Sequence, residues 1–435
     1  MPAAPAGRRL RVAIVGAGWA GLACAMAATE AGHAVAVFEA ARVPGGRARA
    51  VEHLPLPEHL PAGPGPLDNG QHILIGAYTE TLRLMRQVGA DPERLLLRQP
   101  LDLRFADGGG IALPRWPAPL DLLAGVATAR GWSWADRGSL LRASLGWRLA
   151  GFRCDPAATV ADLCAGTTAR VREELIEPLC VSALNTPAAE ASGTVFLRVL
   201  RDALFGVPHG GDLLLPRVDL GALFPMPALP WLAARGAEVR LGSRVQAIVP
   251  TGTGWTVGGE PFDHAVLACP PGEAARLAEG AAGAEAAAWC AQARALRFEA
   301  IATIYAQAPR GLDRAMVALR SSTALPAQFV FDRERLGGPA GLLAFVVSAS
   351  REERHPLEAA VVRQAQEQLG LAVQPFTTIV ERRATFACTP GLARPGGCIA
   401  PGLWACGDYV EGPYPATLEG AVRSGLATGG GPGLS

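Results

Sequence analysis

Lysine is absent from this chain: all 40 basic residues are arginine. Mechanisms that need a lysine nucleophile, a Schiff base or a water held by lysine are therefore excluded. A charge excess of either sign is also missing, because 39 acidic residues leave a formal net charge of +1. Since no global positive field would attract a polyanion, nucleic acid is not an expected partner.

Paired cysteines are missing as well. The nine cysteines are an odd number and form no Cys-x-x-Cys pair, so neither a disulfide framework nor a metal site is indicated. We expect a reducing, cytoplasmic setting. The longest uncharged run, between Arg11 and Glu30, contains three glycines, which is typical of a soluble strand–turn–helix rather than a signal peptide or membrane span.

The composition is that of a globular protein with several structural units. Hydrophobic residues make up 50 % and charged residues 18 % of the 435 positions, which excludes a disordered chain. At roughly 100–200 residues per domain, this length predicts about two to four units with large cores.

The first forty residues carry a dinucleotide-binding pattern. Residues 10–15 and 33–38 are short apolar runs typical of parallel strands, and residues 19–31 between them have a helix-forming composition. The turn from the first strand into the helix has the sequence Gly16-Ala17-Gly18-Trp19-Ala20-Gly21, which would place a pyrophosphate at the helix N-terminus. Glu39 follows 23 residues after Gly16, the spacing of a carboxylate that binds an adenosine ribose. The alternative is a glycine-rich turn beside a surface glutamate.

A second glycine turn, Pro44-Gly45-Gly46-Arg47, comes just after the predicted ribose site and could reach the pyrophosphate from its other side. With this turn the chain resembles the flavin amine oxidase and phytoene desaturase superfamily, and the resemblance implies FAD rather than NAD. No second Gly-x-Gly-x-x-Gly motif supplies a nicotinamide site, so an external reductant for the flavin is expected.

The expected architecture is α/β, with a Rossmann-like FAD-binding domain built from discontinuous segments and an inserted α+β substrate domain. We assign residues 1–90, 238–275 and 398–435 to the first domain, and residues 91–237 (helix-rich) and 276–397 (sheet with helices) to the second. Helices are predicted over 78–88, 357–369 and 416–427, and a proline-rich loop over 54–66. Strands are predicted over 265–268, 298–306, 327–332 and 342–348, and a strand pair over 239–249 and 255–257.

Two segments are similar to one branch of the superfamily, the hydroxysqualene dehydroxylases of bacterial hopanoid and squalene biosynthesis. They are residues 67–78 (LDNGQHILIGAY) and 407–417 (GDYVEGPYPAT). The resemblance implies reductive removal of the hydroxyl of hydroxysqualene to give squalene, with hydride from reduced flavin N5, and transient contact with the synthase that forms hydroxysqualene. It also implies the cofactor-binding residues, which are Gly16, Gly18, Trp19, Ala20, Gly21, Glu39, Ala40, Gly45, Gly46, Arg47, Gly70, Gln71, His72, Val245, Gly407, Asp408, Pro415, Ala416 and Thr417.

Loss of an allylic hydroxyl as water requires an acid, and the ionisable side chains of these two segments are the candidates. They are Asp68, His72, Tyr409, Glu411 and Tyr414. Each has a structural alternative: Asp68 could hold an Asp-Asn-Gly turn, His72 could be a hydrogen-bonded core histidine, and Glu411 could be a loop charge.

Residues 115–153 combine six arginines and four tryptophans with only two aspartates. This composition suits an amphipathic surface on anionic lipid, at the inner face of the cytoplasmic membrane, where a C30 isoprenoid is collected. Equally, the aromatic residues could pack the helices of the substrate domain.

Three other functions are compatible with parts of the sequence. A phytoene-type isoprenoid desaturase would use oxidised FAD and need no acid for a leaving hydroxyl. An amine oxidase fits less well, since that branch commonly uses a water held by lysine. A non-catalytic flavoprotein that carries lipid would bind isoprenoid without turnover.

Overall fold

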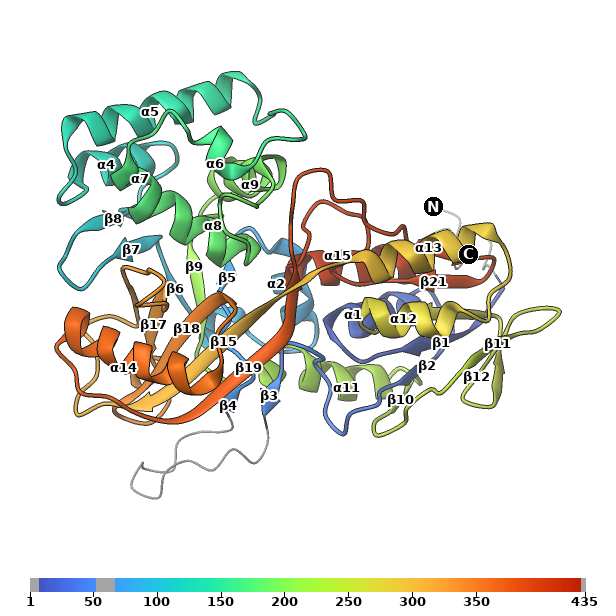
Figure 1. The fold of residues 1–435 in the computed structure, drawn as a ribbon. Coiled ribbons are helices and arrows are strands. Elements are labelled where there is room, and N and C mark those ends of the chain that lie inside the picture. The colour runs from blue at the N-terminus through green and yellow to red at the C-terminus, as the bar shows by residue number, and fades with distance from the viewer. Residues whose placement is uncertain (1–7, 52–66, 432–435) are drawn as a thin grey trace.

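The computed structural model of the chain describes residues 8–51 and 67–431, so the loop predicted for 54–66 lies outside the described residues. It has a mixed α/β fold with one largely parallel sheet and a separate antiparallel sheet, as the sequence predicted (Figure 1).

The largely parallel sheet has six strands drawn from three separated stretches of sequence. Its central strands are apolar and buried on both faces, the pattern of a parallel sheet covered by helices on each side. Only the last two strands pair antiparallel. In spatial order the strands are β10 (Glu238–Arg240), β2 (Ala34–Phe38), β1 (Arg11–Val15), β14 (His264–Leu267), β21 (Leu403–Ala405) and β20 (Cys398–Ala400).

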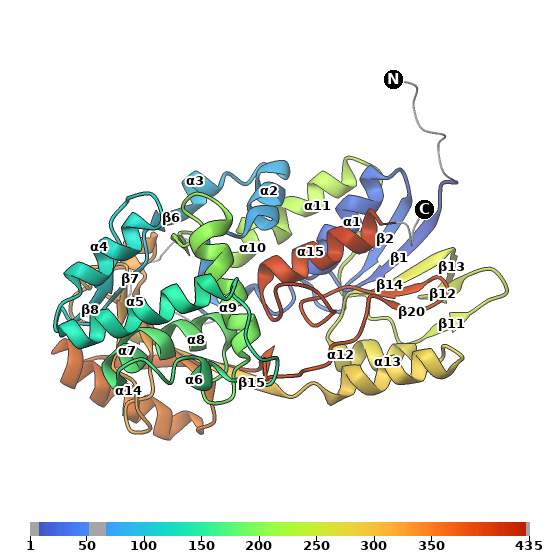
Figure 2. The same ribbon diagram turned by 90° about the horizontal axis from the view of Figure 1, so that it is seen from above.

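Helices α1 (Trp19–Glu30) and α15 (Leu418–Gly429) lie side by side against this sheet, as both ribbon views show (Figures 1 and 2). Their contact depends on glycine. A Cβ atom on Gly425 would stand 2.1 Å from the Ala20 carbonyl oxygen, so a larger residue there would push the helices apart. Three further helices accompany this sheet: α11 (Pro225–Ala233), α12 (Pro271–Ala278) and α13 (Ala284–Ala295).

The antiparallel sheet has five strands and one covering helix. Apolar side chains of its central strands, such as Ile304 and Phe345, pack against Leu357 and Val361 of α14 (Arg354–Leu369). The long strands β15 and β19 extend from this sheet toward the six-stranded sheet (Figure 1). In order the strands are β16 (Met316–Ala318), β17 (Phe329–Asp332), β18 (Leu342–Ser350), β15 (Phe298–Gln307) and β19 (Gln374–Phe386).

Residues 120–206 form helices that lie above the five-stranded sheet in Figure 1, and the rest of the described chain forms further helices, two short strand pairs and small three-stranded sheets. Two π-helical turns, Arg172–Ile176 and Asp202–Gly206, interrupt this region. The longer helices are α2 (Thr79–Gln87), α4 (Leu120–Thr128), α5 (Trp134–Leu149), α8 (Glu177–Leu184) and α9 (Gly193–Arg201). The shorter helices are α3 (Pro92–Leu95), α6 (Val160–Leu163), α7 (Ala169–Val171) and α10 (Leu220–Leu223), with a 3₁₀ turn at Glu334–Leu336. The short strands are β3 (Ala50–Val51), β4 (Leu67–Asp68), β5 (Leu74–Ile75), β6 (Leu96–Gln99), β7 (Asp102–Arg104), β8 (Gly110–Ala112) and β9 (Leu213–Pro216).

Two predicted elements are wrong in detail. Residues 239–249 do not form one strand: β10 joins the parallel sheet, and β11 (Ile248–Pro250) then pairs with β12 (Trp255–Val257), followed by β13 (Glu260–Phe262). Gly242, with φ +69°, breaks the extended run between them. The last helix begins at Leu418 rather than at 416, because Ala416 has a left-handed backbone (φ +56°) and Thr417 caps the helix.

Asp68 ties β4 to two distant elements. Its carboxylate accepts a hydrogen bond from the Leu220 backbone N–H at 2.8 Å, and its backbone carbonyl accepts one from the Tyr305 hydroxyl at 3.0 Å. Burial raises the pKa of Asp68 to about 7, although the Leu220 hydrogen bond opposes this shift.

Among the described residues, no helix is both long enough and apolar enough to cross a bilayer.

Between about pH 5 and about pH 8, we expect the free energy of unfolding of the Asp68→Asn variant to fall less than that of the parent protein. A carboxyl group whose pKa is raised by folding stabilises the fold in its neutral form; this contribution is complete below its ordinary pKa and is lost as pH rises through about 7. Asparagine stays neutral and can still accept the Leu220 hydrogen bond. Thermal unfolding at about pH 5 and about pH 8 should therefore show a smaller fall in Tm for the variant. Equal falls in the variant, the parent and an exposed control, Asp313→Asn, would contradict this role.

Candidate active site

A cavity of about 1220 Å³ runs from the carboxyl end of β1 into the helical region above the five-stranded sheet. This volume exceeds the roughly 300–1,000 Å³ of an ordinary ligand pocket. Polar backbone and charged groups line the end beside β1, whereas leucine, phenylalanine and other apolar side chains line the far end. The cavity is therefore large enough and chemically divided enough to hold a dinucleotide and a long apolar molecule together.

The end beside β1 is built from two glycine turns that contact each other. Gly16, at φ +117°, turns the chain so tightly that a Cβ atom there would stand 2.7 Å from the Ala268 carbonyl oxygen. The Gly45 backbone N–H donates to the Ala17 carbonyl at 2.9 Å, and a Cβ on Gly46 would lie 3.3 Å from the Gly18 Cα. Helix α1 begins here without a side-chain cap, so its first N–H groups can face an anionic ligand.

Glu39 holds this turn region from the end of β2. Its carboxylate oxygens accept hydrogen bonds from the backbone N–H groups of Ala17 at 2.7 Å and Ala41 at 2.8 Å. The Ser243 backbone N–H donates to the Glu39 carbonyl at 2.7 Å, which brings Val245 to the cavity wall after the chain leaves β10. Glu39 thus orders the backbone on both sides of the predicted ribose site.

An ion pair between Arg47 and the buried Asp408 lies on the wall of the cavity. Arg47 also donates to the Ala384 carbonyl at 2.9 Å, which fixes the second glycine turn against the end of β19. Asn69 donates through its side-chain amide to the Arg47 carbonyl at 2.6 Å, so the DNGQH segment packs on the same turn. Three segments that lie far apart in the sequence therefore meet at one charged point.

The structure places nearly all predicted cofactor-binding residues on the wall of this cavity, from Gly16 through Thr417. Gly21 is the exception among them. A Cβ atom on Gly21 would stand 1.9 Å from the Gly16 carbonyl oxygen, so this glycine allows close packing of α1 on β1 rather than contact with a ligand.

The five acid candidates separate into two groups. His72, Tyr409 and Tyr414 line the cavity. Asp68 does not, because its carboxylate faces Leu220, and Glu411 does not, because it lies on an exposed loop after β21. For Asp68 and Glu411 the contacts therefore support the structural alternatives, and neither is placed to give a proton to a ligand in the cavity.

Burial keeps the side chains of both His72 and Tyr409 uncharged. Burial lowers the pKa of His72, and its Nδ1 lies 3.0 Å from the Gly70 carbonyl oxygen, the geometry of a neutral ring that donates from Nδ1. Its Nε2 is then an acceptor and cannot supply a proton. Burial raises the pKa of Tyr409, whose hydroxyl is buried and has no hydrogen-bond partner among the described residues. This hydroxyl is not exposed to the cavity, so only other atoms of Tyr409 are available to a ligand.

Asp202 is a cavity residue that the sequence gave no reason to select. It begins the second π-helical turn, where the changed helical register directs it at the cavity beside Tyr414. The Arg201 guanidinium donates to Asp202 Oδ1 at 2.8 Å, whereas Oδ2 is buried and has no partner among the described residues. Burial and the neighbouring Asp202 carboxylate raise the pKa of Tyr414, so its phenol stays protonated.

We call the polar side chains of the cavity wall, Arg47, His72, Asp202, Asp408, Tyr409 and Tyr414, the polar band. The rest of the cavity in the helical region is an apolar chamber. Its walls come from α4, α5, the two π-helical turns, α8, α9 and the strands β9, β17 and β18. Leu140, Phe196, Leu213 and Phe331 are among the buried side chains that form it. The residues that line this chamber could not be identified from the sequence, since leucine and phenylalanine at helical spacing are equally typical of an ordinary hydrophobic core.

Comparison with known proteins gives whole-length relatives. A protein named hydroxysqualene dehydroxylase from Rhodopseudomonas palustris is 29 % identical over 448 residues, covering 95 % of this chain and 96 % of its own length. One of the same name from Zymomonas mobilis is 27 % identical, with the same coverage. A probable zeta-carotene desaturase from Synechococcus elongatus is 33 % identical, but over only 29 % of this chain and 26 % of its own. The resemblance predicted from residues 67–78 and 407–417 is thus confirmed.

The fold and the family agree. The crystal structure of an oxidoreductase from Methanosarcina mazei superimposes with a TM-score of 0.70 at 16 % identity, covering 96 % of this chain and 99 % of the other, which shows a shared fold. Residues 19–428 match the family described as flavin containing amine oxidoreductase. The chain therefore belongs to the flavin containing amine oxidoreductase family, an assignment that identifies its cofactor as a flavin.

Proposed function

We propose that this protein is an FAD-dependent oxidoreductase that removes the hydroxyl group of hydroxysqualene and yields squalene. The observation that carries the proposal is the single cavity that joins a dinucleotide-type turn to a large apolar chamber through a polar band. The whole-length relatives named hydroxysqualene dehydroxylase support the choice of substrate.

The residues at the β1 end of the cavity fit FAD. The uncapped start of α1 and the paired glycine turns suit a pyrophosphate, and Glu39 stands where a ribose would lie. Arg47 and Asp408 line the same cavity and would contact the bound cofactor. Reduced FAD, when bound, supplies a hydride to an allylic carbon.

The overall reaction adds one hydride and one proton and releases water. The proton must reach the departing hydroxyl, and the structure favours Tyr414 and Asp202 for this task. Tyr414 retains its phenolic proton and can pass it to the departing hydroxyl, and the neighbouring Asp202 carboxylate, held by Arg201, positions that phenol. The phenolate takes up a proton from solvent before the next turnover. The apolar chamber excludes water that would otherwise capture an allylic cation.

The reaction is tested by anaerobic mixing of the purified holoprotein, reduced with dithionite, with hydroxysqualene. Flavin absorbance and extracted lipid are followed together, and we expect squalene to form in step with flavin oxidation over several turnovers. A phytoene-type desaturase would instead reduce the oxidised flavin when mixed with a polyene. Absence of squalene from a protein that retains its flavin would contradict the proposal, and a lipid carrier would bind hydroxysqualene without turnover.

Tyr414→Phe should slow squalene formation about 100-fold or more, the contribution typical of a general acid, and Asp202→Asn should slow it less because it only loosens the position of Tyr414; flavin content should not change in either variant. Tyr409→Phe is the matched comparison, because it removes the hydroxyl of another cavity-lining tyrosine, one that is buried and has no hydrogen-bond partner among the described residues. Loss of turnover in Tyr409→Phe with normal turnover in Tyr414→Phe would contradict the assignment and place the proton at Tyr409.

Glu39→Ala should yield protein with little co-purifying FAD. The substitution removes both the proposed ribose contact and the acceptor that orders the Ala17 and Ala41 amides. The ratio of flavin to protein absorbance gives the occupancy, and circular dichroism checks that the variant is folded. Unchanged occupancy would contradict the cofactor role, and the exposed Glu367→Ala serves as the control.

A further inference from the structure

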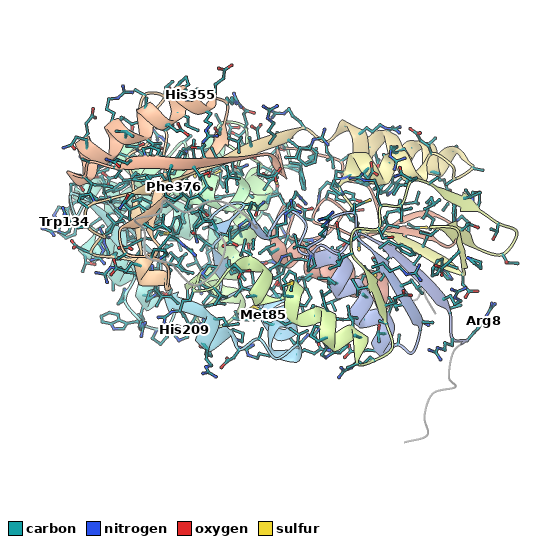
Figure 3. All side chains as sticks on the ribbon, turned by 90° about the horizontal axis from the view of Figure 1, so that it is seen from below. Arg8, Met85, Trp134, His209, His355 and Phe376 are labelled. Atoms are coloured by element: carbon teal, nitrogen blue, oxygen red, sulfur yellow. The ribbon has the colours of Figure 1, made fainter. Side chains whose placement is uncertain are left out.

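The outer face of α4 and α5 exposes an unusual amount of apolar surface. On α5, Trp134, Leu141, Leu145 and Leu149 follow one another at spacings of seven and four residues, so they form one stripe along the helix. Trp134 is 84 % and Leu149 80 % exposed, and on α4 Leu120 and Leu123 are also exposed. We name these six side chains the α4–α5 face. Figure 3 shows Trp134 at the edge of the molecule opposite Arg8, far from the six-stranded sheet.

The charge around this face is positive and is not neutralised within the described part of the chain. Arg142 and Arg153 are exposed and contact no carboxylate there, and Arg148 lies over the Phe205 ring. The two aspartates of the region are used locally: Asp121 accepts from the Leu122 backbone N–H, and Asp136 accepts from Ser133 and Thr168. The face therefore combines apolar and cationic side chains, which matches an anionic lipid surface.

The face also surrounds the opening of the cavity. Leu123, Leu141 and Leu145 are exposed to solvent on the face and at the same time line the apolar chamber. Arg148 and Phe205, at the end of α5 and in the second π-helical turn, do the same. A hydrophobic molecule that reached the chamber across this face would not have to pass through water.

The geometry points to an anionic phospholipid bilayer as the partner of the α4–α5 face. The two helices lie in the plane of the bilayer surface, their leucine and tryptophan side chains enter the acyl boundary, and the arginines contact lipid phosphates. The cavity then opens into the bilayer, which stores the substrate. Passage of hydroxysqualene by this route rests on the proposed function, whereas docking itself does not depend on it.

Docking is tested by flotation of the holoprotein with vesicles of phosphatidylcholine, with and without phosphatidylglycerol. We expect binding to the vesicles that contain phosphatidylglycerol, weakened by salt. The double variants Trp134→Ser/Leu149→Ser and Arg142→Glu/Arg153→Glu should each lower the partition coefficient about tenfold or more. None of these four residues lines the cavity, so turnover in detergent should not change. The matched controls are Met226→Ser/Val249→Ser and Arg310→Glu/Arg382→Glu, exposed residues outside the face.

Several outcomes would overturn the inference. These are vesicle binding that persists in both face variants, absence of binding by a protein that turns over in detergent, and a dimer in solution that Trp134→Ser/Leu149→Ser converts to a monomer. The last result would identify a second copy of the chain as the occupant. Vesicle binding without turnover in detergent would instead contradict the proposed function and leave docking supported.

Discussion

The close approach of two glycine turns at the end of the parallel sheet is the constraint on which the rest of the structure depends. The turn after β1 can pass the Ala268 carbonyl only because residue 16 has no side chain, and the Gly45–Gly46 turn can then lie directly on it. Glu39 fixes this arrangement through two backbone amides. Because Arg47 follows the second turn immediately, its side chain lies at the cavity wall, where it pairs with Asp408.

The cavity that this ion pair lines has two chemically different ends. On one side are backbone groups suited to a dinucleotide, and on the other an apolar chamber with few polar atoms. The polar side chains between them are largely held in neutral forms: His72 is kept neutral by burial, and Tyr409 and Tyr414 retain their phenolic protons. A site of this kind favours transfer of a hydride and a proton while excluding solvent, and the absence of lysine removes the lysine-dependent alternative.

The functional residues that could be predicted from the sequence are those whose motif requires a particular residue type at a fixed spacing. Gly16, Glu39, Gly45 and Asp408 could be found because backbone turns and strand ends impose fixed residue types at fixed spacings. Asp202 could not, since a π-helical turn leaves no recognisable spacing and its contact with Tyr414 joins residues far apart in the chain. Asp68 was a candidate acid because its segment is at the site, but strand alternation turns its carboxylate toward Leu220 instead. The proposed domain boundaries stay a prediction.

The cofactor and the isoprenoid are proposed to share one continuous cavity. This arrangement is tested most directly by titrating the oxidised holoprotein with squalene in detergent while recording the visible absorbance of the flavin. We expect a saturable shift of the flavin bands that is complete at about one squalene per flavin, because the apolar chamber opens onto the polar band. Squalene that binds at this stoichiometry, as measured by equilibrium dialysis, without altering the flavin spectrum would show two separate sites and contradict the account.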